Sequence, residues 1–130
     1  MPRLFRKIGI GFVALLFLTS GTCHFLLTGF FVAIMPPYLP WHHAAVYVSG
    51  AFELLGAFGL LVPATRRAAG IGLLILTILV TPANVHMWAH PELFPQIPES
   101  LLFWRLPAQA ALLAVIWFSM IRPAPKSESG

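Results

Sequence analysis

Six strongly polar side chains lie inside long apolar stretches of the sequence, where they are costly to bury. A carboxylate, a guanidinium, two imidazoles and two amides together supply hydrogen-bond donors and acceptors, so as a group they can bind a polar head group or move a proton. Because a charge in mid-membrane costs about 3 kcal/mol or more unless it is paired or hydrated, we expect these side chains to meet. They are His24, Glu53, Asn84, His86, Arg105 and Gln109.

Each of these side chains, taken alone, also has a purely structural interpretation. Glu53 is the only acidic residue within an apolar stretch and Arg105 the only basic one, so we expect them to pair. Such a pair either takes part in function or only fixes helix register, and the sequence leaves both open. For His86, a place at the membrane interface beside Trp88 is the preferred interpretation, and for His24 a hydrogen-bonded place in the core. The functional interpretation depends on several of these side chains meeting at one place, not on any one of them.

The apolar stretches form four blocks separated by prolines and charges. Of the 130 residues, 58% are hydrophobic and only 9% are charged, too few to cover the surface of a soluble protein of this size. Each block approaches or exceeds the length of about 20 residues that crosses a bilayer. We therefore expect an all-α transmembrane four-helix bundle as a single domain over residues 1–122, with a disordered cytoplasmic tail over 123–130. The helices are expected at about residues 8–35, 44–62, 68–88 and 101–121.

The basic residues predict the orientation of these helices. Seven of the eight Lys and Arg residues lie before the first block, between the second and third, or after the fourth, whereas the loops at 36–43 and 89–100 contain none. By the positive-inside rule both termini are cytoplasmic and these two loops face outward. Because the charge lies in loops and not on one face, a nucleic-acid partner is not expected. The first block continues too far for a cleaved signal, so we expect a retained helix.

Helix geometry predicts that the polar residues share one depth. At a rise of about 1.5 Å per residue, Asn84 lies roughly 24 Å above the inner edge of a hydrocarbon core about 30 Å thick. By the same rise, Glu53 lies about 13 Å, Gln109 about 12 Å and Arg105 about 6 Å below the outer edge. His24 falls in the same outer half. The four spans therefore predict one polar layer in the outer half of the bundle.

Spacing along two helices also groups polar side chains on common faces. Thr77, Thr81 and Asn84 are separated by four and three residues, which places them on one side of their helix. Arg105 and Gln109 are four residues apart and share a face of the next helix. These faces are expected to turn toward the interior.

Several segments in fixed order resemble a known family. The segments GTCHF, PPYLP, VSGAFELLGAFGLLVPATRRAAG, TPANVHM and RLPAQ are similar to those of the DoxX-like family of small membrane proteins. The resemblance extends from about residue 21 to 117 and implies a multi-pass four-helix bundle in a bacterial inner membrane. The namesake is linked to thiosulfate:quinone oxidoreduction, and other members to complexes for thiol and oxidant handling. The family pattern maps onto His24, Glu53, Asn84, Arg105 and Gln109.

These observations lead to an expected function. We expect a redox-associated membrane subunit that binds a quinone or a similar amphiphile in the polar layer of the outer half. The His, Asn, Arg and Gln side chains would donate hydrogen bonds to the ligand, and Glu53 would relay a proton. With Cys23 as the only cysteine, no sulfur relay is available, so thiosulfate chemistry is not expected. Aromatic walls are expected from Phe25, Phe52, Trp88 and Trp104.

Two other functions compete with this one. The main alternative is a non-catalytic scaffold or assembly partner, whose polar layer is structural and whose outer loops dock a membrane or redox protein or a second copy. A haem held by His24 and His86 ranks third, because no carboxylate–histidine spacing supports a metal site, and none is expected. No nucleophile–base arrangement identifies an enzyme, so the sequence leaves that question open.

Overall fold

The computed structural model of the chain describes residues 2–95 and 97–123. Within these residues every regular element is a helix and no strand occurs, as the sequence predicts. The tail that we expect to be disordered lies, from residue 124 on, outside the described residues. Four helical stretches are long and apolar enough to cross a membrane, so the chain is a multi-pass helical bundle: Arg3–Leu26, His42–Leu61, Arg66–Ala89 and Glu99–Ile121.

Some of these stretches consist of more than one helical element. The first is followed by a short separate helix, the third contains a break, and the fourth ends in a π-helix. In chain order the elements are α1 (Pro2–Leu26), α2 (Thr28–Ala33), α3 (His42–Leu61), α4 (Arg66–Leu79), α5 (Thr81–Ala89), the 3₁₀ turn η1 (Pro91–Leu93), α6 (Glu99–Ile116) and the π-helix η2 (Trp117–Ile121).

Two single residues interrupt helices that the sequence predicts to be continuous. Leu27 leaves helical geometry, with φ −121° and ψ 42°, and so separates α2 from α1. Val80 separates α4 from α5, because Pro82 in the first turn of α5 has no N–H to continue the ladder of α4. The N–H groups of Ala83 and Asn84 instead donate to the carbonyl oxygen of Val80, at 3.1 and 3.3 Å. The expected helix over residues 8–35 is therefore wrong in its second part.

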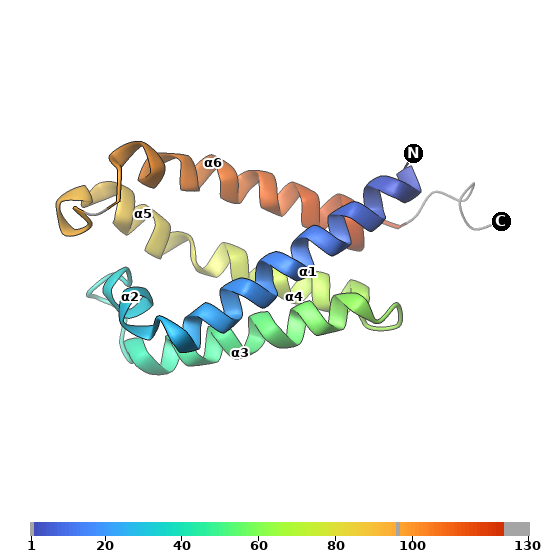
Figure 1. Cartoon of the computed structure of the whole chain (residues 1–130), viewed down its shortest axis with the longest axis horizontal. Coiled ribbons are helices and arrows are strands. Elements are labelled where there is room, and N and C mark those ends of the chain that lie inside the picture. The colour runs from blue at the N-terminus through green and yellow to red at the C-terminus, as the bar shows by residue number, and fades with distance from the viewer. Residues whose placement is uncertain (1, 96, 124–130) are drawn as a thin grey trace.

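The bundle has two differently built ends. Figure 1 shows the start of α1, the α3–α4 turn and the end of η2 at one end, and α2 and η1 at the other. We call the first the arginine end, because Arg6, Arg66, Arg67 and Arg122 belong to it, and the second the loop end. At the arginine end, the guanidinium of Arg6 donates to the backbone carbonyls of Ser119 and Arg122. These bonds join the start of the first helix, α1, to the end of the last one, η2.

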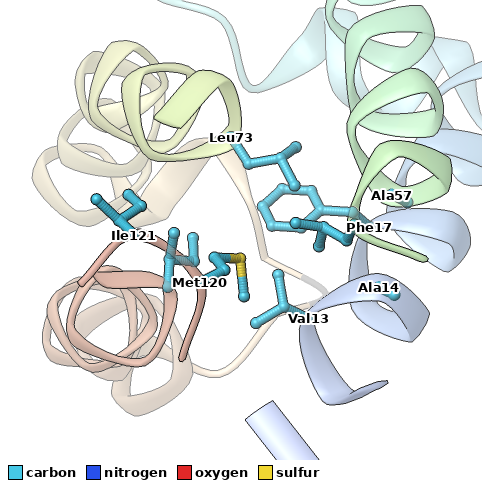
Figure 2. Close-up of a cluster of buried hydrophobic side chains, with 9 residues drawn as sticks. Val13, Ala14, Phe17, Ala57, Leu73, Met120 and Ile121 are labelled. Carbon is cyan, nitrogen blue, oxygen red and sulfur yellow. The ribbon is translucent and has the colours of Figure 1, made fainter. Parts of the chain in front are cut away.

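The main hydrophobic core lies toward the arginine end. Val13 and Phe17 of α1 meet Leu73 of α4 and Met120 of η2 there (Figure 2). A smaller cluster at the loop end joins the segment after α2 to α5 and α6. In the third and fourth spans the polar residues predicted to form a layer fall between these two clusters in sequence. The smaller cluster consists of Ile34, Met87, Phe94 and Leu102.

The outward faces of the helices are apolar. Leu15 of α1, Leu55 of α3 and Leu79 of α4 are 66%, 68% and 67% exposed. A water-soluble protein rarely presents such continuous apolar surface, whereas lipid chains solvate it without cost. The bundle therefore presents the kind of surface that a bilayer requires.

Candidate functional site

A cavity of about 350 Å³ opens between the loop end and the main core. Four of the six predicted polar residues line it: His24, Glu53, Asn84 and Arg105. Its volume lies near the lower limit of the roughly 300–1,000 Å³ that is typical of small-molecule sites. The segment after α2 contributes Ile34, Met35, Pro36 and Leu39 to the lining, and α3 and α4 contribute further apolar side chains such as Val46 and Leu76.

The carboxylate of Glu53 is held by two groups of α1. Ser20 Oγ donates a hydrogen bond of 2.8 Å to Oε1, and Nδ1 of His24 lies 3.1 Å from Oε2. The same Nδ1 is 2.7 Å from the backbone carbonyl oxygen of Ser20. Because a carbonyl oxygen only accepts, Nδ1 must carry a proton, which leaves Nε2 as the nitrogen that can gain or lose one. The imidazole is further fixed by stacking on Phe31, with 4.0 Å between ring centroids.

Two glycines bring α1 and α3 close enough for these contacts. A Cβ at Gly50 would lie 2.7 Å from the Cβ of His24, and one at Gly21 would lie 3.0 Å from the backbone oxygen of Gly50. Only the absence of both side chains permits this approach. Gly50, the first glycine of the SGAFELLGAFGLL segment, thus allows Glu53 to lie beside α1.

A second wall of the cavity is a side-chain network between α5 and α6. Nη2 and Nε of Arg105 donate to Oδ1 of Asn84, at 3.1 and 3.3 Å. Nδ2 of Asn84 donates to Oε1 of Gln109, whose Nε2 donates in turn to Oγ1 of Thr81. Residues 81 and 84 lie on one face of α5, and residues 105 and 109 lie on one face of α6. The members of each pair are separated by about one turn of their helix, so the two pairs can bond across the contact. Every bond of this network joins one helix to the other.

The predicted ion pair between Glu53 and Arg105 is wrong. Glu53 pairs with His24, and Arg105 donates to Asn84. Counting residues along a helix gives the depth of a side chain but not its direction around the helix axis, and direction decides the partner here. Sequence reasoning also missed Ser20, although its place four residues before His24 puts it on the same face of α1.

The two remaining polar residues lie outside the lining of the cavity. Gln109 is the second member of the α5–α6 network, behind Asn84. His86 instead lines a separate, shallower pocket with Tyr38 and His90, and its ring centroid is 4.9 Å from that of His90. Of the six residues, four share the cavity, one supports it, and His86 lies apart.

The positions of the histidines do not fit a haem. His24 and His86 line different cavities, so neither cavity presents both imidazoles to one iron. Across residues 2–95 and 97–123, no three His, Cys, Asp or Glu side chains are grouped so as to hold a metal ion.

The aromatic walls expected from the sequence are also wrong. Phe25, Phe52, Trp88 and Trp104 are 44%, 60%, 50% and 61% exposed and none of them lines the cavity. Large rings in a membrane span can face lipid as easily as the interior. The residue type alone therefore does not show whether an aromatic side chain points into the bundle or out to the lipid. The cavity is walled by Phe31 and by aliphatic side chains.

One comparison with known proteins gives a match. The family model described as a domain of unknown function (DUF8561) matches residues 13–120, which include every residue that lines the cavity. No curated protein and no solved structure matches the chain. The match makes no connection with DoxX-like proteins, so that resemblance stays an expectation from the sequence.

Proposed function

Since the chain belongs to DUF8561, a family whose description assigns no function, we propose from its geometry that it binds the polar head of a quinone-like amphiphile. The binding site is the cavity of about 350 Å³, and the protein acts as the membrane subunit of a redox complex. The observation that carries this proposal is that one apolar cavity within a membrane-spanning bundle is lined both by the His24–Glu53 pair and by Arg105.

The hydrogen-bonding groups of the cavity match the two oxygens of a quinone. Arg105 uses Nε and Nη2 for Asn84, which leaves further N–H groups of its guanidinium for a ligand oxygen. His24 uses Nδ1 for the carbonyl oxygen of Ser20, with Oε2 of Glu53 3.1 Å away, so its Nε2 accepts a bond from a hydroxyl or donates one to a carbonyl after protonation. Glu53 beside Nδ1 stabilises the protonated imidazole. The site can therefore hold both the carbonyl and the hydroxyl form of the ring.

The membrane setting supports the same kind of ligand. We propose that the protein lies in a bacterial inner membrane with both termini cytoplasmic, which puts the cavity in the outer half. The arginine end carries Arg6, Arg66, Arg67 and Arg122, whereas the loops at residues 36–43 and 89–100 contain no Lys or Arg, which by the positive-inside rule favours a cytoplasmic arginine end. A ligand that partitions into the bilayer reaches such a site through the lipid.

Titration of the detergent-purified protein with a short-chain ubiquinone analogue tests this function. We expect saturable binding that weakens at least tenfold in Arg105→Gln and in His24→Phe, because each change removes a contact to one ligand oxygen. Arg67→Gln, which removes an arginine at the opposite end of the bundle, should bind like the unaltered protein. Equal affinity in all four proteins would overturn the proposal.

A scaffold function is the second candidate, and one observation favours it. Thr81, Asn84, Arg105 and Gln109 hydrogen-bond to one another without any ligand. If the polar layer only fixes α5 against α6, Arg105→Met combined with Gln109→Met should lose the co-purifying subunits, because Asn84 and Thr81 are left without their partners. Loss of ligand binding with retained assembly in this double variant would instead support the quinone-binding function.

A further inference from the structure

A larger hollow lies on the outside of the bundle, along the groove between α3 and α4. Its volume is about 600 Å³, and it is separate from the cavity that contains Glu53. The lining has small side chains toward the arginine end and large apolar ones toward the loop end. We call it the α3–α4 groove, and its lining includes Gly59, Ala68 and Gly72 on the small side and Phe52, Leu55 and Leu79 on the large side.

The described chain leaves this groove open. A Cβ at Gly72 would meet no atom within 4 Å, although Gly72 lines the groove. Leu55 and Leu79, at its other end, are among the most exposed apolar side chains of the protein. On the face of a membrane-spanning bundle, an open apolar groove is filled either by a lipid chain or by another helix.

The length of the groove corresponds to one leaflet. Its lining on α4 runs from Ala68 to Leu79, which at 1.5 Å per residue is about 17 Å. Half of a hydrocarbon core about 30 Å thick is about 15 Å. An acyl chain that starts at the arginine end would therefore stay within the groove for nearly its whole depth in that leaflet.

A fixed arginine stands at the end of the groove where an acyl chain would start. Thr65 and Gly59 form that end of the lining, and Arg66 directly follows Thr65 in the chain. Nε of Arg66 donates a hydrogen bond of 2.7 Å to the carbonyl oxygen of Leu60, the residue after Gly59. The guanidinium is therefore fixed on the last turn of α3, next to the end of the groove, while its two NH₂ groups stay available for an anion.

The surroundings of Arg66 are positively charged and lack a compensating acid. Arg6, Arg67 and Arg122 lie at the same end of the bundle. The acidic residues that the structure describes are elsewhere: Glu53 is paired with His24, and Glu92 and Glu99 belong to the loop end. An anion at this end therefore meets attraction from several side chains and repulsion from none of the described ones.

We propose that the α3–α4 groove binds one acyl chain of an anionic phospholipid, whose phosphate is held by Arg66. The groove alone would accept any lipid chain, and the arginine alone any anion. Any phospholipid has apolar chains linked through its glycerol to a phosphate and so can occupy both. An anionic phospholipid also has a net negative charge, which the arginines at this end attract, so it is the preferred occupant. This site is independent of the quinone-binding proposal: Leu76 and Leu79 border both cavities, but His24, Glu53, Asn84 and Arg105 line only the other one.

Native mass spectrometry of the purified protein, with dioleoyl-phosphatidylglycerol and dioleoyl-phosphatidylcholine added in turn, tests this site. We expect a bound lipid with preference for phosphatidylglycerol. Arg66→Gln should reduce that preference about fivefold, the equivalent of roughly 1 kcal/mol for one basic residue near the membrane surface. Arg122→Gln is the matched control, because Arg122 belongs to the same end but lies over the Phe118 ring, 5.5 Å from its centroid. An equal reduction in both variants would assign the preference to general surface charge and overturn the site.

A glycine pair tests the acyl chain separately. Gly72→Leu places a side chain in the groove without a clash, so it should abolish retention of both lipids. Gly11→Leu is the control, because a Cβ at Gly11 of α1 also meets nothing within 4 Å but lies outside the groove. Unchanged lipid retention in Gly72→Leu would overturn the proposal. If Gly72→Leu instead converted a dimer to a monomer with lipid retention intact, the groove would be a contact between two copies. Circular dichroism confirms that both variants keep their helix content.

Discussion

Arg105 donates two hydrogen bonds, from Nε and from Nη2, to the single Oδ1 atom of Asn84. This contact joins α6 to α5 at the point where α5 begins, just after the break at Val80. Because Asn84 satisfies Arg105, the carboxylate of Glu53 is left to His24 and Ser20 on the other side of the fold. The two charged groups of the membrane interior thus have separate partners and one cavity between them, instead of a direct ion pair that would close it.

Asn84→Ala should destabilise the bundle, because it removes the acceptor of Arg105 and the donor to Gln109 in one change. We expect the free energy of unfolding to fall by about 1–2 kcal/mol, as hydrogen bonds between membrane helices are individually modest but a half-satisfied buried network is costly. Thermal unfolding in detergent measures this. Thr22→Ala is the control, since the hydroxyl of Thr22 is exposed and bonds only to the carbonyl oxygen of Leu18 in its own helix. Equal stability of the two variants would contradict a role for the network.

Gly9→Ala should be destabilising for a steric reason. A Cβ at Gly9 would lie 1.9 Å from Oγ and 2.8 Å from Cβ of Ser119, at the contact between α1 and η2. We expect a loss of about 1–3 kcal/mol, the usual cost of overpacking, despite the higher helix propensity of alanine. Gly11→Ala, where a Cβ meets open space, should be neutral or stabilising in the same unfolding assay. Ser119→Gly combined with Gly9→Ala should recover most of the loss, and no recovery would place its cause elsewhere.

The imidazole of His24 should carry a proton on Nδ1 whatever its charge. This follows from the 2.7 Å separation between Nδ1 and the carbonyl oxygen of Ser20, which cannot donate. Long-range ¹⁵N–¹H spectra of imidazole-labelled protein distinguish the tautomers, and His43, exposed at the start of α3, serves as an internal comparison. A neutral His24 with its proton on Nε2 would contradict the arrangement around Glu53.

The orientation of the chain can be tested with single cysteines. In a Cys23→Ser background, Tyr38→Cys at the loop end should react with a membrane-impermeant maleimide added to intact cells. Arg67→Cys at the arginine end should react only after the membrane is opened. Both positions are exposed in the structure, so access to solvent does not favour either. Reaction of the two positions in the reverse order would show that the termini face outward and the cavity lies in the inner half.

Much of the fold could be predicted because membrane-spanning helices have a strong sequence signal. Apolar length and proline positions suffice to find four spans. The interruptions at Leu27 and Val80 were harder to predict. Pro82 gives a reason for the second, but Leu27 is an ordinary helix-forming residue, so its own type gives no sign of the break.

The candidate site could be predicted only in part, for a geometric reason. Depth along four helices placed His24, Glu53, Asn84 and Arg105 at one level, and all four line one cavity. The partner of each depends on the rotation of every helix about its axis, which one sequence leaves undetermined. Aromatic residues were the weakest guide, because a ring that faces lipid looks the same in sequence as one that faces a ligand.

The breaks at Leu27 and Val80 also have a mechanical consequence. Helices α1, α3, α4, the end of α6 and η2 share the main core at the arginine end, whereas α5 packs on α4, η1 and α6. Of the segments that line the cavity, α5 and the stretch that begins with α2 are thus joined to α4 and α1 through single residues outside helical geometry, whereas α3 and α6 continue without such a break. The bundle is therefore stiffer at the arginine end than at the loop end. A force applied at the loop end bends these two joints before it strains the core, so contact with another protein there would change the width of the cavity while the bundle stays folded.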